Sequence, residues 1–422
     1  MVFYLSEQTI TENVGAMPRT IRDHNRKLVL KAVSERDSFS VTDIAADVML
    51  SRQSVMKALT HFLDRGLIVS LGKGSSTEIG GKKPEMYAFR PPQRILAILH
   101  RTNAMVFQLM DMACNCLDTL SIPISKTLTD DEFVEALRAG AQKMMMRNLD
   151  LKTTLYGVAM AVGGQVELEH HTMHRSMYFS NLSVGLPVYD ILQTIFPEVP
   201  CIQVDCIGRM AGQSVLFNTE LIRKNKRVFT LYIDRGITGC FFMDGKLQTE
   251  STLMLLEAGH MVLDAHDDER CTCGKYGCAE SLISLQRMRR SIEEQLPQYP
   301  NSCLAHIAPR LIGFDDVFSG SRSGDALCRC ESQRLANAIG HLLRNIFLVC
   351  EPGLVVFMGN FSNADAVFDK TLREAVQSDY VYTLREGTFD VFYDHRELPA
   401  IEAQGCAQSV IKFFYDDERL YT

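Results

Sequence analysis

The pattern of hydrophobic and polar positions predicts three short helices and then two strands in the first 92 residues. A helical face begins after Ile21, and a second helix starts within residues 39–42, where Ser40 or Thr42 can cap it. A third helix is predicted from Ser51 to Gly66, because its apolar positions form one stripe and glycine favours the left-handed conformation that ends helices. Strands are predicted over residues 67–70 and 85–89. The region therefore has the pattern of a helix-turn-helix followed by a winged hairpin.

After Pro91 and Pro92, which interrupt regular structure, strand-like and helix-like stretches alternate to the end of the chain. This alternation predicts an α/β body. Strands are expected at 95–99, 105–110, 117–124, 155–162, 201–204, 228–233, 240–243 and 354–358, and helices at 131–147, 205–217, 281–295, 324–350 and 406–414.

Composition indicates a globular protein and argues against a protein that spans a membrane. Of the 422 residues 46% are hydrophobic, and no apolar run reaches the ~18 residues that a membrane helix needs. The first residues lack the basic start and apolar block of a signal peptide. The thirteen cysteines are therefore expected in a reducing compartment, and we expect the protein to be cytoplasmic.

Charge is unevenly distributed along the chain. Residues 19–94 hold 14 basic and 8 acidic side chains, whereas the remainder carries a net charge of −13, giving −7 overall. A basic head on an acidic body indicates that only the head meets a polyanion.

Three cysteines and a histidine lie close together between His260 and Glu280. The spacing of Cys271, Cys273 and Cys278, with His260 eleven residues upstream, suits one tetrahedral Zn²⁺. Four protein ligands leave no open coordination position, so the predicted zinc is structural rather than catalytic. The alternative is that some of these residues are ordinary buried thiols.

The same stretch, Glu257-Ala-Gly-His260 followed by Cys271-Thr-Cys273 and Gly277-Cys278-Ala-Glu280, resembles the zinc signature of the ROK family of repressors and sugar kinases. The resemblance implies a bilobal, actin-like sugar-kinase fold of the ribonuclease H-like type. Family members are either sugar kinases or sugar-responsive transcription factors with an added N-terminal DNA-binding domain. We accordingly expect a lead-in at 1–20, a winged helix-turn-helix domain at 21–92 and an effector and oligomerisation domain at 93–422.

Polar side chains at the start of the third predicted helix are the candidate DNA readers. They lie largely off its apolar stripe, where they can reach base edges in the major groove: Arg52, Gln53, Ser54 and Lys57. In the wing, Lys82 and Lys83 stand where the family's regulators usually carry two arginines. Lysine lacks the planar fork of arginine, so we expect general phosphate attraction from this wing. The alternative is a winged-helix domain that binds protein.

The segments that resemble the family's phosphate loops have lost glycines. The first, Leu99-His100-Arg101-Thr102-Asn103-Ala104, has no glycine and no acidic residue, the second has gained Arg235, and the third reads Gly359-Asn360. A phosphate cannot nest against a backbone that side chains hold away. We therefore expect no ATP binding and no enzyme activity.

The resemblance also supplies candidate ligand-binding residues. Asp205 stands at the position of the kinases' general base. It is expected to be a vestigial base, because Val204 replaces the asparagine that precedes the base in the family. Glu257, His260 and Glu280 match other sugar-contacting positions, and paired carboxylates with an imidazole suit a polyol. In the alternative interpretation, Asp205 caps a helix and Glu280 braces the zinc loop.

These observations predict a transcriptional regulator, most simply a repressor of carbohydrate uptake or catabolism genes. Its expected partners are an operator in double-stranded DNA, a sugar or sugar-phosphate effector and further copies of itself in a homodimer or tetramer, without a membrane. Two alternatives remain: an ATP-dependent sugar kinase with an accessory head, and a regulator controlled by a transport-system protein. The cluster of His170, His171 and His174 is expected to be a loop, and Cys328 and Cys330 are expected to serve packing.

Overall fold

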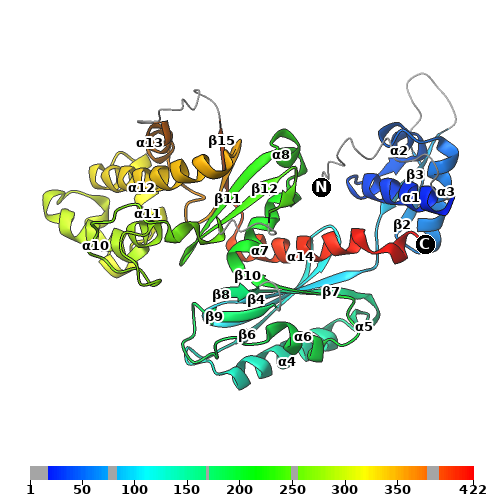
Figure 1. Cartoon of the computed structure of the whole chain (residues 1–422), viewed down its shortest axis with the longest axis horizontal. Helices are drawn as coiled ribbons and strands as arrows, with labels where there is room; N and C mark the ends of the chain where they lie inside the picture. The colour runs from blue at the N-terminus through cyan, green and yellow to red at the C-terminus, as the bar shows by residue number, and fades with distance from the viewer. Residues whose placement is uncertain (1–17, 75–82, 168–170, 249–254, 378–388) are drawn as a thin grey trace. The chain divides into compact units, whose positions relative to one another are not determined.

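The computed structural model divides the chain into two compact units. The first contains the chain up to Ile207 together with Cys406–Thr422, and the second contains Gly208–Gly405 (Figure 1). None of the helices that the structure describes is long and apolar enough to cross a membrane. The described residues are 18–74, 83–167, 171–248, 255–377 and 389–422.

The head, residues 18–92 of the first unit, consists of three helices and a three-stranded antiparallel sheet of order β1-β3-β2. Its elements are α1 (Pro18–Ser34), β1 (Phe39–Ser40), α2 (Val41–Asp47), α3 (Arg52–Asp64), β2 (Ile68–Lys73) and β3 (Glu85–Phe89). Side chains from all three helices fill its core, among them Val29, Leu30, Val33, Ile44, Val55, Leu59 and Phe62.

Caps set the helix boundaries of the head. Ser40 forms a capping box with Asp43 at the start of α2, and the Ser51 hydroxyl accepts the Ser54 N–H at the start of α3. After α3, Gly66 has a φ of +67°, a conformation that favours glycine. The second helix starts where it was expected, with Ser40 as its N-cap. The two residues before it also form a short strand that the sequence did not indicate, because Phe39 pairs with Tyr87 and stacks on its ring.

The body of the first unit is built on a five-stranded sheet of order β10-β7-β4-β5-β6. Strands β4, β5 and β6 form an antiparallel meander, and β7 and β10 add in parallel to β4. The bounds are β4 (Arg94–His100), β5 (Ala104–Asp111), β6 (Cys116–Pro123), α4 (Asp130–Arg147), α5 (Leu151–Thr154), β7 (Leu155–Val162), β8 (Gly164–Glu167), β9 (Thr172–Ser176), α6 (Val188–Ile195) and β10 (Cys201–Cys206).

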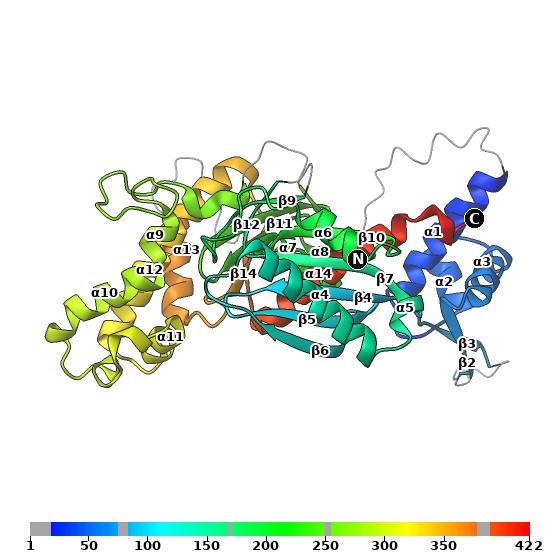
Figure 2. The same ribbon diagram turned by 90° about the horizontal axis from the view of Figure 1, so that it is seen from below.

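Two glycines show how closely helices cover this sheet. A side chain at Gly140 of α4 would meet the Phe107 ring of β5 at 2.1 Å, and one at Gly157 of β7 would meet Val410 of α14 (Leu398–Asp416) at 2.2 Å. These contacts place α4 and α14 directly against the strands, and Figures 1 and 2 show the two helices in this packing.

The second unit repeats this sheet pattern in the order β13-β12-β11-β14-β15. Again an antiparallel meander is extended by two parallel strands. Its elements are α7 (Ile207–Gln213), which begins in the first unit, α8 (Thr219–Lys224), β11 (Arg227–Ile233), β12 (Ile237–Met243), β13 (Lys246–Leu247), α9 (Ala279–Ile283), α10 (Leu285–Gln295), α11 (Phe314–Arg322), α12 (Ala326–Cys350), β14 (Leu354–Gly359), α13 (Ala366–Gln377) and β15 (Asp390–Asp394). Short 3-10 helices cover 214–217, 255–260, 296–298, 303–306 and 309–311 in this unit, and one covers 418–420 in the first unit.

The structure corrects two expected helices. Strand β10 continues through Asp205 to Cys206, and α7 begins only at Ile207, so Asp205 lies in a strand rather than at a helix cap. The helix expected over 281–295 is two helices separated at Ser284, whose side chain caps α10. Pairing of Asp205 and Cys206 with β7 sets the first boundary and the Ser284 cap sets the second, and periodicity alone reveals neither.

The C-terminal segment returns to the head within the first unit. Arg26 of α1 donates to the Tyr421 carbonyl at 2.6 Å, and Lys27 forms an ion pair with Asp416 at 2.9 Å. The His61 ring of α3 lies 3.0 Å from the Leu420 carbonyl. Head and C-terminal segment therefore share a contact surface.

Candidate metal centre and ligand residues

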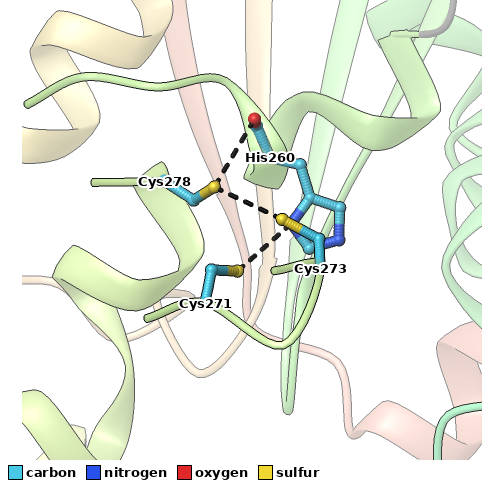
Figure 3. Close-up of side chains that lie close together, drawn as sticks. All are labelled: His260, Cys271, Cys273 and Cys278. Atoms are coloured by element: carbon cyan, nitrogen blue, oxygen red, sulfur yellow. Dashed lines mark hydrogen bonds between the residues drawn. The ribbon is translucent and has the colours of Figure 1, made fainter. Parts of the chain in front are cut away.

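The four residues predicted as metal ligands lie together in the second unit (Figure 3). Cys273 Sγ and Cys278 Sγ are 3.6 Å apart, and Cys271 Sγ is 3.5 Å from His260 Nδ1. An ion with tetrahedral bonds of about 2.3 Å to sulfur and 2.0–2.1 Å to nitrogen needs neighbouring sulfurs about 3.8 Å apart and sulfur about 3.5 Å from nitrogen. The observed separations are close to both values, so the group can hold a metal ion.

A tightly folded loop brings the sulfurs together. Gly277 has a φ of +66°, and a side chain there would lie 1.6 Å from the Asp264 carbonyl oxygen. The Leu263 N–H donates to the Gly277 carbonyl, and the Cys271 N–H donates to that of Lys275. The loop thus depends on glycine where two backbone segments meet.

The thiols of the cluster differ in acidity. Burial opposes ionisation of Cys273, but hydrogen bonds from the Lys275 backbone and from the neighbouring cysteines outweigh it and lower its pKa. Burial raises the pKa of Cys278, and its contacts with Cys273 and Cys271 act in the same direction. Of these two thiols, Cys273 therefore loses its proton more readily than Cys278, and a bound cation would favour the thiolate form of both.

His260 has a partner for each ring nitrogen. Nδ1 faces Cys271, whereas Nε2 lies 3.6 Å from the Glu257 carboxylate. A carboxylate behind a ligating imidazole orients the ring and increases its basicity. Glu257 can thus support the metal cluster from behind the imidazole, a role for which the sequence contained no separate signal.

Glu280 connects the metal loop to the segment after β11. Its carboxylate accepts from the Ile237 N–H at 3.1 Å and from the Thr272 hydroxyl at 3.3 Å. The absence of side chains at Gly236 and Gly259 leaves room for it, since a Cβ at either position would lie within 3.3 Å of Glu280 Oε2. These contacts correspond to the bracing alternative stated for Glu280.

In the segments that resemble the phosphate loops, backbone N–H groups are already hydrogen-bonded within the protein. In the first unit, Arg101 N–H closes a turn onto the Ala104 carbonyl. In the second unit, Asn360 donates its backbone N–H to Ile233 and its side-chain amide to the Asp234 carbonyl. The N–H groups of Arg101, Ile237 and Asn360 therefore already have protein acceptors.

The candidate ligand residues are divided between the two units, with Asp205 in the first and Glu257, His260 and Glu280 in the second. Asp205 is buried, and its carboxylate accepts from the Cys206 N–H at 2.6 Å. Of the histidine cluster, His170 lies outside the described residues. His171 contacts the Val204 carbonyl through Nδ1.

The candidate DNA readers lie at the beginning of α3. Arg52, Gln53 and Lys57 are exposed, and the Ser54 hydroxyl is bonded to that of Ser51 at 2.9 Å. Of the two wing lysines, Lys83 is exposed and Lys82 lies outside the described residues.

A second sulfur cluster went unnoticed in the sequence. Cys328, for which packing was expected, lies with its sulfur 3.8 Å from that of Cys303 and close to Asp325. Twenty-five residues separate the two cysteines, and no motif connects them.

Two five-stranded sheets with the same pairing pattern, one in each unit, and a His-Cys₃ cluster in the second unit agree with the actin-like sugar-kinase fold that the sequence led us to expect. The sequence profile of the ROK family matches residues 102–397, and the chain belongs to that family.

Relatives of both functional types are found. The chain is 27% identical to a glucokinase of Thermotoga maritima over 45% of its own length and 59% of the enzyme's. It is 19% identical to the DNA-binding transcriptional repressor Mlc of Escherichia coli over 87% of its length and 88% of the repressor's. It is 22% identical to the xylose repressor of Caldicellulosiruptor bescii over 84% of its own length and 88% of that repressor's.

Solved structures confirm the fold. A ROK family transcriptional regulator, a homologue of E. coli Mlc, superposes with a TM-score of 0.76 at 16% identity, covering 95% of this chain and all of the other. A ROK family glucokinase from Streptomyces griseus, in complex with glucose and AMPPNP, gives 0.60 at 15% identity, covering 74% of this chain and 98% of the enzyme.

Proposed function

We propose that this protein is a DNA-binding transcriptional regulator, acting as a repressor of carbohydrate uptake or catabolism genes under the control of a small sugar or sugar phosphate. The observation that carries the proposal is the extent of the similarity. The two repressors match 84–87% of this chain, whereas the Thermotoga glucokinase matches 45%. The family profile begins only at residue 102, so the repressor matches reach into the head.

The head supplies the DNA contact in this proposal, as a winged helix-turn-helix domain spanning residues 21–92. Helix α3 buries Val55, Leu59 and Phe62 and exposes Arg52 and Lys57. A helix held by one face can present the other to a major groove. One such helix reads few base pairs, so the operator is expected to bind two heads from a homodimer or tetramer.

DNA binding is tested by genome-wide pull-down with purified protein, followed by fluorescence anisotropy on the recovered duplexes. Arg52→Ala is expected to cost about 1–3 kcal/mol of binding free energy on the recovered site and to reduce sequence preference. Lys126→Ala removes an exposed cation outside the head and is the matched control. Recovery of random fragments at low salt, with no difference between the two variants, would refute the proposal.

The body acts as an effector domain, residues 93–422, with Asp205, Glu257, His260 and Glu280 as candidate ligand residues. Thermal-shift titration with hexoses, amino sugars and their phosphates tests for the effector. A stabilising compound should also change operator affinity, because only a ligand with different affinities for the two states shifts their equilibrium. If no sugar responds while DNA binding persists, control by a protein partner is favoured instead.

We further propose Zn²⁺ as the ion held by His260, Cys271, Cys273 and Cys278. One imidazole and three thiolates are a donor set that zinc favours, and four protein ligands make the site structural. A bound ion supplies folding free energy to the loop, on the order of 10 kcal/mol in small zinc modules. Cys271→Ser should therefore lose zinc, thermal stability and repression together. A variant that stays stable and active would disprove this assignment.

A sugar kinase with an accessory head is the second candidate, favoured by the glucokinase similarity and by the retained Asp205. Against it stand the side chains in all three segments that resemble phosphate loops and the protein acceptors that their N–H groups already have. A coupled assay for ADP release with hexoses and amino sugars decides between the two candidates. Turnover that disappears in Asp205→Asn would establish the kinase.

A further inference from the structure

A second group of potential metal ligands lies in the second unit, separate in sequence and residues from the His260 cluster. Cys303 begins a 3-10 helix, Asp325 is the N-cap of α12, and Cys328 lies in the first turn of that helix. The two sulfurs and a carboxylate oxygen all lie within 4.8 Å of one another. Among the residues that the structure describes, these three and the His260 cluster are the two groups with this geometry.

The sulfur separation fits a tetrahedral ion. Cys303 Sγ and Cys328 Sγ are 3.8 Å apart, which matches the distance of about 3.8 Å that zinc–sulfur bonds of about 2.3 Å require. At Gly320 of α11 a Cβ would lie 2.4 Å from the Cys328 sulfur and 2.9 Å from the Cys303 sulfur. The absence of a side chain at this position is therefore necessary for the pair of thiols to fit.

The carboxylate has capacity for a cation. Asp325 Oδ1 accepts from the Cys328 N–H and from the Ser302 hydroxyl, each at 3.0 Å, and Oδ2 accepts from the Cys303 N–H at 2.7 Å. A carboxylate offers about four acceptor sites, and the thiols of Cys303 and Cys328 also hydrogen-bond to this one. A cation that displaces the thiol protons would take over the acceptor capacity that those protons use. The three hydrogen bonds from N–H and hydroxyl groups fix the carboxylate beside the thiols.

We propose that Cys303, Asp325 and Cys328 form a second site for a thiophilic divalent cation of the Zn²⁺ type. Two thiolates with one carboxylate are donors that zinc accepts, whereas Mg²⁺ and Ca²⁺ prefer oxygen alone. Cys328 is buried and Cys303 is exposed, so the fourth coordination position faces solvent and is filled by water. The ion fastens the segment at Ser302–Cys303 to the start of α12.

Metal counting on the full-length protein tests the proposal. Reduced protein is stripped with a chelator, titrated with Zn²⁺ against a chromophoric competitor, and weighed by native mass spectrometry. Wild type should take up two equivalents per chain, the second weaker because it has three protein ligands rather than four. The Cys303→Ser variant, in which only an exposed side chain is changed, should take up one equivalent. Cys271→Ser should retain the second site and lose the first.

Two further variants separate a metal site from a packed pair of thiols. Cys330→Ser is the matched control: it lies two residues further along α12, its thiol contacts Gln295, and it should still take up two equivalents. Asp325→Asn keeps a good N-cap side chain but removes the charge, so it should weaken the second equivalent about tenfold or more without unfolding α12.

Three outcomes would overturn the proposal: a single equivalent in wild type, a second equivalent that survives Cys303→Ser, or a Cys303–Cys328 disulfide in protein that binds no second ion. Thiol counting before and after reduction identifies the disulfide case. DNA binding is measured separately, so failure of this proposal is distinguishable from failure of the regulator assignment.

Discussion

The buried imidazole of His100 should make the stability of the protein depend on pH. The side chain is fully buried at the end of β4, stacked on Phe179 and edge-on to Phe133. Neither ring nitrogen has a hydrogen-bond partner among the described residues. Burial lowers the pKa of His100 from 6.5 to about 4. The native state therefore holds this ring neutral under conditions in which the unfolded chain protonates it.

The sign and size of the effect follow from this difference in pKa. Between pH 6.5 and pH 4 the unfolded state binds more protons than the native state, so stability is fully present above about pH 6.5 and is lost as pH falls. The complete loss corresponds to about 3 kcal/mol, and about 2 kcal/mol of it is reached by pH 5.

Urea unfolding at pH 7.5 and pH 5.0 measures this loss. His100→Phe keeps an aromatic ring against Phe179 and cannot protonate, so the drop in unfolding free energy between the two pH values should be about 2 kcal/mol smaller than in wild type. Strain from the larger ring affects both pH values alike and cancels in this comparison. An equal drop in both proteins would show that His100 is not held neutral by burial, and the reasoning would be wrong.

Three other perturbations have defined outcomes. Gly277→Ala places a Cβ 1.6 Å from the Asp264 carbonyl oxygen, so metal content of the His260 cluster and melting temperature should both fall. Arg26→Ala removes the donor to the Tyr421 carbonyl, and limited proteolysis should cut the C-terminal segment faster. Lys57→Ala should weaken DNA binding on all sequences and lower the salt slope of log K by about 1 in anisotropy titrations.

Matched controls exist for each of these. Gly185 has a φ of +77° but open space around it, so Gly185→Ala carries only the cost of a left-handed alanine, about 1–2 kcal/mol. Arg22 forms an ion pair with its neighbour Asp23, so Arg22→Ala should leave proteolysis of the C-terminal segment unchanged. Lys126→Ala should leave the salt slope intact. A Gly277→Ala protein as stable as Gly185→Ala would contradict the described loop.

Local sequence signals predicted the parts of the structure that local chemistry determines. Ser40 and Ser51 cap α2 and α3 because a hydroxyl that accepts an orphan N–H acts within three residues. The ligands of the His260 cluster fall within nineteen residues, so their grouping was visible as spacing. The fold and family expected from this stretch were confirmed by the comparisons.

Features that depend on packing between distant segments were not predictable in this way. Asp205 was expected to begin a helix, yet its strand continues because each residue from Cys201 to Cys206 pairs with β7. Cys303, whose sulfur lies beside that of Cys328, is twenty-five residues away in the sequence. Glu280 and Ile237 are separated by forty-three residues, so their hydrogen bond has no trace in a local pattern.

The contact between the head and the C-terminal segment has a consequence for biosynthesis. Lys27 and Asp416 are separated by 389 residues, and Arg26 and Tyr421 by 395. The ribosome releases the head first and these partners hundreds of residues later, at roughly 5–20 residues per second. For tens of seconds the nascent head lacks part of its native surface, and its full maturation awaits synthesis of the segment that holds Asp416 and Tyr421.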